Sequence, residues 1–103
     1  MINSQLITPR NIVVVGASQN EQKPGGKVLR NLLEGNFQGA IYALNKKEIA
    51  IDGVIHVSSV QQLNDLVDLA IIAIPAKQSV EIIKELIALK TKAFIIYSAG
   101  FSE

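Results

Sequence analysis

Short apolar runs recur along this chain and are separated by polar or amphipathic stretches. The first run, Asn11–Val15, consists of β-branched residues after its asparagine. Such a run is typical of a strand that is buried on both faces of a parallel sheet. Comparable runs, each predicted to form a strand, lie at Ala40–Leu44, Val54–Val57, Val67–Ile74 and Ala93–Tyr97.

Two longer stretches show helical periodicity. In Gly25–Glu34 the apolar residues recur on one side, while Lys27 and Arg30 lie on the other, which predicts an amphipathic helix. Lys77–Lys90 shows the same pattern and predicts a second helix. The apolar stripe of the first helix is predicted to consist of Val28, Leu29, Leu32 and Leu33, and that of the second of Val80, Ile83, Leu86 and Ile87.

Local signals predict where helices begin and end. Gly35 follows the first helix and is predicted to adopt the left-handed backbone conformation that often closes a helix. Ser59 and Gln62 have the spacing of a capping box, in which two side chains each bond a backbone N–H at the helix start. A short helix is therefore predicted at Val60–Leu66.

Strands that alternate with helices are typical of α/β proteins, because a crossover helix joins each pair of parallel strands. We therefore predict a doubly wound parallel sheet of five strands between two helical layers. The predicted strand order is 3-2-1-4-5, with the strand Asn11–Val15 at the centre. The chain length corresponds to one domain over residues 1–103.

Four short segments of small or polar residues follow predicted strands. In sheets of this kind ligands bind beyond the carboxyl ends of the strands, at the point where the strand order reverses. We therefore expect the four segments to meet at one edge of the sheet, although they lie far apart in the sequence. They are Gly16–Ser18, Asn45–Lys47, Pro75–Ala76 and Ser98–Phe101.

The segment between the first strand and the first helix is predicted to hold a phosphate group. Gly16 ends the strand, and Pro24 suits the first helical position, where its missing N–H costs nothing. Gly25 and Gly26 leave the start of the helix without side chains. Backbone N–H groups point outward from a helix N-terminus, and the helix dipole favours negative charge there.

Composition narrows the range of functions. The 103 residues include ten basic and nine acidic ones, a net charge of +1, which gives no reason to expect nucleic acid or an anionic membrane as a partner. No apolar run approaches the ~18 residues of a membrane span, and the start lacks the features of a signal peptide, so a cytoplasmic protein is expected. There is no cysteine, and His56, the only histidine, is predicted to lie away from the ligand edge, without a catalytic or metal-binding role.

The sequence argues against two common nucleotide-binding motifs. The G-x-G-x-x-G fingerprint of dinucleotide-binding proteins is absent, and Asn45 stands where a carboxylate would hold a ribose hydroxyl. Lys46 and Lys47 suit a phosphate better, so the 2′-phosphate of NADP stays open on that ground. A Walker A site is excluded, because Lys27 is followed by Val28 instead of serine or threonine.

Three separated segments, in this order, resemble the CoA-binding domain of NDP-forming acyl-CoA synthetases: PRNIVVVGASQNEQKPGGKVLRNLLEGNFQGAIYALN, VDLAIIAIPA and FIIYSAGFSE. This family includes ADP-forming acetyl-CoA synthetase and the α subunit of succinyl-CoA synthetase. The resemblance covers almost all of the chain from Pro9 to Glu103. It implies a Rossmann-like fold and CoA, in place of NAD, as the ligand.

The resemblance also implies which residues contact CoA. The first loop would lie along the CoA phosphates, and the turn after the second strand would approach the adenosine 3′-phosphate. The turns after the fourth and fifth strands would border the adenine and the pantetheine arm. The residues carried over are Gly16, Ala17, Ser18, Lys23, Pro24, Gly25, Gly26, Asn45, Lys46, Lys47, Ile74, Pro75, Ala76, Ser98, Ala99 and Gly100.

Two departures from the family pattern affect these expectations. The family usually has Asn-Pro-Lys after the second strand, whereas this chain has Asn45-Lys46-Lys47, which makes the turn less rigid. The family also continues beyond the position of Glu103, into a domain with a phosphorylated histidine and an ATP-grasp domain. We therefore expect a fragment of a larger synthetase that does not catalyse ligation alone, with those domains as partners. The alternatives are a stand-alone regulatory or interaction domain that binds CoA and, less favoured, part of an NAD(P) oxidoreductase.

Several of the site residues also have a purely structural explanation. Gly16, Gly25 and Gly26 equally suit a tight turn and close packing. Ser18 equally suits a turn hydroxyl, and the lysines equally suit solvated surface positions. Pro75 suits a strand terminator.

The fifth predicted strand is expected to lie at an edge of the sheet. Its apolar residues at Phe94–Tyr97 would then be exposed together with unpaired backbone groups. Exposed apolar edges favour pairing with another strand. We therefore expect two copies of the chain to associate through this strand.

Overall fold

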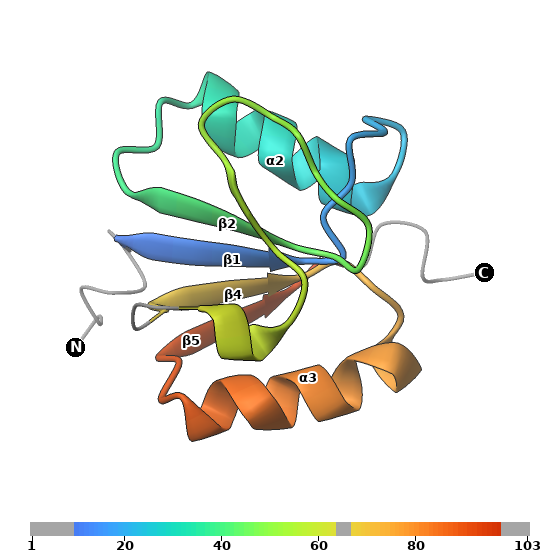
Figure 1. The fold of residues 1–103 in the computed structure, drawn as a ribbon, viewed down its shortest axis with the longest axis vertical. Helices are drawn as coiled ribbons and strands as arrows, with labels where there is room; N and C mark the ends of the chain where they lie inside the picture. The colour runs from blue at the N-terminus through green and yellow to red at the C-terminus, as the bar shows by residue number, and fades with distance from the viewer. Residues whose placement is uncertain (1–9, 64–66, 98–103) are drawn as a thin grey trace.

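The computed structural model describes residues 10–63 and 67–97. Their helices and strands alternate along the chain, as the sequence predicts (Figure 1). In chain order they are β1 (Asn11–Val15), α2 (Pro24–Glu34), β2 (Ala40–Leu44), β3 (Ile55–Val57), the 3-10 helix η1 (Val60–Gln62), β4 (Leu69–Ile72), α3 (Ala76–Ala88) and β5 (Ala93–Ile96). Neither described α-helix is long and apolar enough to cross a membrane.

The five strands form one parallel sheet in the order β3-β2-β1-β4-β5, so the predicted fold and strand order are confirmed. β1 lies at the centre, where Val13 is in register with Tyr42 of β2 on one side and with Ala70 of β4 on the other. The helix α2 covers one face of the sheet, while η1 and α3 cover the other (Figure 1). The strand order reverses between β1 and β4.

Both faces of β1 are buried, as its continuous apolar run predicts. Ile12 and Val14 belong to the core cluster that contains the apolar side of α2. Val13 and Val15 belong to the other cluster, with Leu86 of α3. The four residues of β1 after Asn11 are at most 2% exposed. Each side of the sheet therefore has its own core, as expected for a three-layer α/β fold.

Several elements differ in length from the predictions. β4 is shorter than the predicted Val67–Ile74, although the flanking Val67 and Ala73 are buried. Pro75 is the N-cap of α3, which begins at the next residue. The other described bounds lie within one or two residues of the predicted ones. Buried residues extend further along the chain than the residues that pair with neighbouring strands. Apolar content alone therefore overestimates the length of the strand.

The predicted apolar stripe of α3 is partly wrong. Leu86 is fully buried, but Val80 is 48% exposed and Ile87 is 58% exposed. The buried side of the helix instead includes Ser79, which is 2% exposed, and Ile82 packs against the same core. Ser79, Ile82 and Leu86 follow one another at helical spacing, as the residues of the predicted stripe do. The sequence has apolar residues on more than one side of α3, so periodicity could not select the side that faces the sheet.

The predicted left-handed residue at the end of α2 is also displaced by one position. Gly35 has a φ of −81°, whereas Asn36 has a φ of +57°. The Gly35 N–H donates to the carbonyl oxygen of Asn31, which continues the helical pattern before the chain turns. Asparagine is among the few residues with a side chain that adopt the left-handed conformation readily, so it takes this role here.

The predicted capping box is not formed. Ser59 is the N-cap of η1 but makes no side-chain capping hydrogen bond. The Gln62 Oε1 atom instead accepts from the backbone N–H of Ser58, at 2.6 Å, and from its hydroxyl, at 3.1 Å. The helix predicted at Val60–Leu66 is described only to residue 63, as the 3-10 turn of η1, and residues 64–66 lie outside the described residues.

Candidate functional site at the carboxyl edge of the sheet

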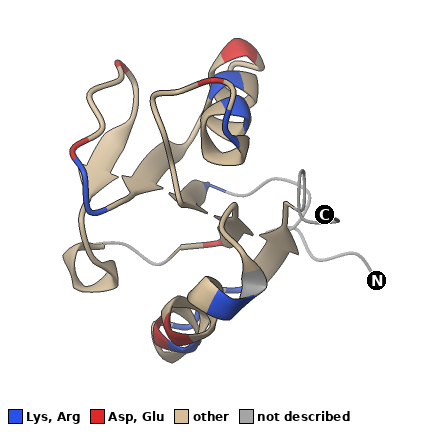
Figure 2. Ribbon diagram, turned by 90° about the vertical axis from the view of Figure 1, so that its right-hand side faces the viewer, with Lys and Arg blue, Asp and Glu red and all other residues tan. Residues whose placement is uncertain are grey.

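The carboxyl edge is the side of the sheet toward which the parallel strands point, and Figure 2 looks onto it. Gly16 follows β1 there with a φ of +85°, a conformation that residues with a side chain rarely adopt. A Cβ atom at Gly16 would clash with Cγ2 of Ile74 and lie 3.1 Å from the carbonyl oxygen of Ala73. Glycine is therefore required here, because the loop after β1 passes close to the segment that follows β4.

The first turn of α2 carries open backbone donors. Pro24 begins the helix, and the N-cap Lys23 makes no side-chain capping hydrogen bond. Within the described residues, the N–H groups of Gly25 and Gly26 have no hydrogen-bond acceptor. The first turn also contains no acidic residue. These two N–H groups therefore lack an acceptor at the positive end of the helix dipole, although both glycines are buried.

Gly25 and Gly26 also pack closely against the loop that precedes the helix. A Cβ atom at Gly25 would clash with the carbonyl oxygen of Gly16, and one at Gly26 would clash with that of Asn20. The close-packing explanation therefore holds for both glycines.

Ser18 and Asn20 shape this loop. The Ser18 hydroxyl accepts from the N–H of Asn20, at 3.0 Å, and the Asn20 side chain accepts from the N–H of Gln22, at 2.9 Å. Both are local turns in which a short polar side chain binds the backbone two residues ahead. The turn explanation for Ser18 is thus satisfied, and its hydroxyl keeps a second lone pair and its proton for a ligand.

Asn45 joins the loops after β1 and β2. Its Nδ2 donates to the carbonyl oxygen of Ala17 at 2.6 Å, and its Oδ1 accepts from the N–H of Lys47 at 3.0 Å. Both ends of the amide are therefore engaged inside the protein, which indicates a positioning role. An asparagine that turns the chain just after a strand is a recognised signal in sequence, so this role was accessible to sequence reasoning.

His56 lies closer to the carboxyl edge than predicted. Its Nε2 is 2.9 Å from the carbonyl oxygen of Asn45, and that geometry assigns the ring proton to Nε2. The prediction that His56 sits away from the edge is therefore wrong. The reason is the parallel register, which places His56 of β3 beside Ala43 of β2, two residues before Asn45. Within the described residues, no group of three or more histidine, aspartate or glutamate side chains could hold a metal ion.

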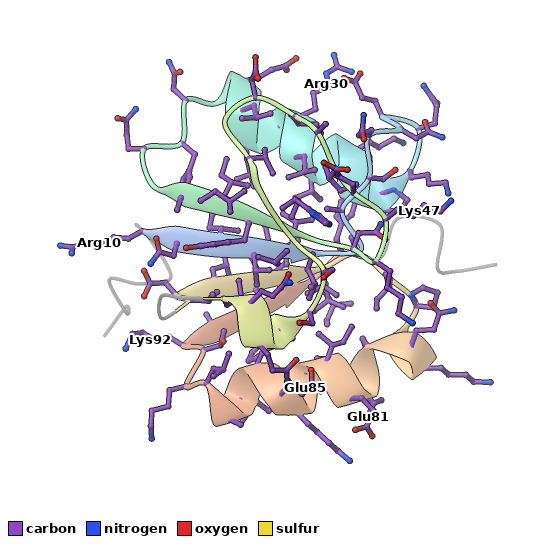
Figure 3. All side chains as sticks on the ribbon, in the orientation of Figure 1. Arg10, Arg30, Lys47, Glu81, Glu85 and Lys92 are labelled. Atoms are coloured by element: carbon purple, nitrogen blue, oxygen red, sulfur yellow. The ribbon has the colours of Figure 1, made fainter. Side chains whose placement is uncertain are left out.

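Four predicted site lysines lie at the start of α2 or after β2: Lys23, Lys27, Lys46 and Lys47. All four are exposed, and none forms an ion pair with another described residue. Figure 2 shows basic segments at the connection after β2 and on α2, and Figure 3 shows Lys47 at the end of the sheet opposite Arg10 and Lys92. The carboxyl edge therefore has uncompensated positive charge.

Arg30 differs from these lysines because its guanidinium group forms ion pairs with acidic side chains. Its Nε donates to Glu34 at 3.0 Å, and its Nη1 lies 3.5 Å from Glu21. The hydrogen bond to Glu34, together with the negative charges of Glu34 and Glu21, raises the pKa of Arg30 above its ordinary value. Arg30 is thus already neutralised and is a poor candidate for binding an anion.

A cavity of about 650 Å³ opens at the carboxyl edge, on the side of the sheet covered by η1 and α3. Of the predicted site residues, Gly16, Asn45, Lys46 and Ile74 line it. Pro75 is exposed and is not part of the lining, and the predicted Ser98, Ala99 and Gly100 lie outside the described residues. The lining residues that sequence reasoning missed include Ser58, Ser59, Gln61, Gln78, Ile82 and Glu85.

The missed residues come from η1 and the two residues before it, and from α3. No motif marks these positions, because serine, glutamine and glutamate are ordinary surface residues in a helix or turn. Only the packing of η1 beside α3 brings them to one cavity. Four of the residues predicted from the sequence therefore line the cavity, whereas the wall formed by η1 and α3 was not predicted.

A family model described as CoA binding domain matches residues 10–103. The ADP-forming acetate–CoA ligase II of Archaeoglobus fulgidus is 38% identical over 98 residues, which are 95% of this chain and 15% of that protein. A trans-feruloyl-CoA synthase of an unknown prokaryotic organism is 34% identical over 99 residues, 96% of this chain and 14% of that protein. The chain thus spans about a seventh of the length of these relatives.

Solved structures give the same result for the fold. Acetyl-coenzyme A synthetase 1 of Ca. Korarchaeum cryptofilum, described as dinucleotide forming and in complex with phosphate and ADP, matches with a TM-score of 0.80 and 33% identity. The match covers 87% of this chain and 20% of that one. A conserved hypothetical protein of Pyrococcus furiosus matches with a TM-score of 0.73 and 30% identity, over 84% of this chain and 73% of that one.

The family match extends over nearly all described elements and includes the loops that surround the open donors of α2. The relatives named as ADP-forming ligases align over almost the whole chain. On this evidence the chain is a member of the CoA binding domain family, and it matches the CoA-binding region of ADP-forming acyl-CoA synthetases.

Proposed function

We propose that this chain binds CoA at the carboxyl edge of its sheet, with the diphosphate at the start of α2. The observation that carries the proposal is the pair of open N–H donors at Gly25 and Gly26, with no acidic residue in the first helical turn. Donors in this arrangement stabilise a phosphate through hydrogen bonds and through the helix dipole. The residues present therefore fit the group that the family name implies.

The lysines at the carboxyl edge would supply the positive charge that balances the phosphates of CoA. CoA carries a diphosphate and a 3′-phosphate, so several cations at separate positions suit it better than one. Lys23 and Lys27 flank the first turn of α2. Lys46 lines the cavity, and Lys47 is the next residue in the chain. We assign the first pair to the diphosphate and the second to the 3′-phosphate.

Lysines 46 and 47 provide the direct test of this assignment. The double variant Lys46→Ala/Lys47→Ala should bind CoA about tenfold more weakly, because it removes charge-assisted contacts to phosphate. Isothermal titration with CoA measures the loss, and titration with 3′-dephospho-CoA should show little difference between the variant and the wild type. A higher salt concentration should reduce the difference in CoA affinity between the variant and the wild type.

The matched control is the double variant Lys84→Ala/Lys92→Ala, which removes the same charge away from the carboxyl edge. Lys84 lies on α3 beside Glu81, and Lys92 lies at the opposite end of the sheet (Figure 3). This control should bind CoA as the wild type does. A folded wild-type chain with no CoA binding at millimolar concentration would refute the proposal.

We propose further that the chain serves as the CoA-binding unit of an ADP-forming acyl-CoA synthetase. The full reaction would interconvert acyl-CoA, ADP and phosphate with the carboxylic acid, CoA and ATP. The curated relatives with names of this kind support the proposal. The partners would be a domain with a phosphorylated histidine and an ATP-grasp domain, as the family resemblance implies.

A stand-alone CoA-binding domain is the second candidate function. The Pyrococcus furiosus structure favours it, because this chain covers 73% of that protein, against 15% of the ligase from Archaeoglobus fulgidus. The two candidate functions are distinguished by mixing the chain with purified phosphohistidine and ATP-grasp domains and adding CoA. Assembly and acyl-CoA synthesis are expected for the first candidate and neither for the second.

Among the described residues β5 is an edge strand, and we propose that it pairs with a second copy of the chain. Ile95 and Ile96 are 44% and 51% exposed, and β5 is the last strand in the order. Ile95→Lys should lower the dimer fraction in sedimentation velocity at least fivefold, since charged residues disfavour edge pairing. Ile55→Lys, on the opposite edge strand β3, is the control and should leave that fraction unchanged. A wild-type chain that sediments as a monomer would contradict the proposal.

A further inference from the structure

The only histidine of the chain holds the backbone of the turn after β2. The carbonyl oxygen of Asn45 lies 2.9 Å from Nε2 of His56, and it can only accept, so the ring donates this hydrogen bond. The N–H of Asn45 donates to the carbonyl oxygen of Val57 at 3.1 Å, and its side-chain amide bonds the backbone at both ends. Of these bonds, only the one from His56 acts on the peptide group that joins Asn45 to Lys46.

This bond sets the direction of the next N–H group. In a planar trans peptide the C=O and the N–H point in opposite directions. With the Asn45 carbonyl held by His56, the N–H of Lys46 therefore points away from the ring. This N–H has no acceptor among the described residues, and Lys46 is exposed. The turn thus presents an open backbone donor next to the side chains of Lys46 and Lys47.

β3 fixes the position of the ring. His56 is in register with Ala43 of β2, and Ala43 belongs to the core cluster on the α2 side of the sheet. The ring is partly buried, and the following residue, Val57, is 4% exposed. The donor therefore comes from a strand, whereas the acceptor lies in a turn.

The turn itself has little to restrain it. Lys46 and Lys47 lack the ring by which proline fixes φ, and both are exposed. The N–H of Lys47 bonds the Asn45 side chain at 3.0 Å, which leaves the peptide group before Lys46 dependent on His56. A turn that is ordered before a ligand arrives loses less conformational entropy on binding.

We infer that His56 is a positioning residue for CoA. Its Nε2–H fixes the peptide group between Asn45 and Lys46, so that the open N–H and the two lysine side chains meet the 3′-phosphate in one arrangement. The inference rests on the proposed function, in which this turn binds the 3′-phosphate. His56 itself does not contact the ligand.

His56→Leu tests the inference by removing the donor. This variant should bind CoA about fivefold more weakly, which is the typical net contribution of one hydrogen bond. Its affinity for 3′-dephospho-CoA should stay within about twofold of the wild type, because that ligand has no group at the turn. Isothermal titration measures both ligands, and circular dichroism verifies the fold.

Two amide variants separate the hydrogen bond from the side-chain volume. In His56→Gln the amide nitrogen is the same number of bonds from Cα as Nε2, so this variant should bind CoA nearly as tightly as the wild type. In His56→Asn the nitrogen is one bond closer to Cα and does not reach, so the affinity should fall as in His56→Leu. If His56→Leu does not fold, this pair gives the same comparison.

Hydrogen exchange gives a measurement that does not depend on a ligand. The N–H of Lys47 lies within the turn and should exchange about fivefold faster in His56→Leu and in His56→Asn, but not in His56→Gln. The N–H of Val14, in the central strand β1, is the internal control and should keep its protection in every variant.

The outcomes distinguish this inference from the proposed function. If a folded wild-type chain does not bind CoA, both are refuted. If the wild type binds CoA and His56→Leu binds it equally tightly, the inference alone is overturned. An equal loss for CoA and for 3′-dephospho-CoA would also overturn it, because His56 would then support the whole site instead of this turn.

Discussion

Replacing Gly25 with alanine should lower the free energy of unfolding by about 3 kcal/mol and abolish CoA binding. The new Cβ atom would clash with the carbonyl oxygen of Gly16, and the carbonyl carbon of Gly16 and the Cα of Ala17 would lie only 2.8 and 3.0 Å away. These neighbours are backbone atoms, which cannot rotate aside. The loop after β1 must move off the first turn of α2, and that movement takes the open N–H donors out of register with the lysines.

Thermal unfolding and CoA titration measure the two effects separately. For a domain of this size, a loss of 3 kcal/mol corresponds to a decrease in the melting temperature of roughly 15 °C. Gly35→Ala is the control at the other end of α2. There φ is −81°, and the nearest atom to a new Cβ is the Asn31 carbonyl oxygen at 3.2 Å, so a change below about 1 kcal/mol is expected. A Gly25→Ala variant with wild-type stability and CoA affinity would show that the loop does not need to rest on the helix.

Leu86→Ala should lower the free energy of unfolding by about 3 kcal/mol, within the range measured for fully buried leucines. Leu86 is 0% exposed and belongs to the core cluster that contains Val13, Val15 and Ile72. Truncation removes apolar contacts and leaves a cavity between α3 and the sheet. Because domains of this size are stable by only about 5–15 kcal/mol, the effect is a large fraction of the total.

The adjacent residue provides the control. Ile87 is 58% exposed, so Ile87→Ala should change the free energy of unfolding by no more than about 0.5 kcal/mol. Urea denaturation at constant m-value measures both variants. If Ile87→Ala were as destabilising as Leu86→Ala, then Ile87 would be covered in solution, as it would be if a partner chain packed on α3.

The bonds of Asn45 give the site its rigidity. One side chain ties the loop after β1 to the turn after β2, through the carbonyl oxygen of Ala17 and the N–H of Lys47. Gln19 adds a second link, because its Oε1 accepts from the N–H of Ala50 at 3.3 Å. The start of α2, which packs against Gly16 and Ala17, is therefore linked to the turn after β2 that lines the cavity beside α3. A ligand that occupies both places pays little entropy for ordering the protein.

Asp68 performs a similar bracing role at the opposite end of the sheet. Its Oδ2 accepts from the N–H groups of Arg10 and Asn11, at 2.8 and 3.3 Å. Asp68 is 8% exposed, and these bonds join the start of β1 to the segment just before β4. The two central strands are thus held together at the end of the sheet where no ligand is proposed.

Sequence reasoning identified the strands because their apolar runs are short, β-branched and separated by turn residues. It located the glycine loop after β1 for a related reason, because Gly16 indicates the end of a strand and Pro24 indicates the start of a helix. It was wrong about Gly35, because a neighbouring asparagine adopts the left-handed conformation as well as glycine does. It was wrong about Val80 and Ile87, because α3 is apolar on more than one side.

By itself the sequence determined the parallel α/β fold, the order of the strands and the loops that lie at the carboxyl edge. Those features follow from local patterns, since apolar periodicity and turn residues act over a few neighbouring positions. Only the tertiary structure decided which side of α3 faces the sheet and that Glu85 shares a cavity with Lys46. In the sequence, β3, η1, β4 and most of α3 lie between these two residues. Their proximity depends on how η1 and α3 pack against the sheet, which no short stretch of sequence specifies.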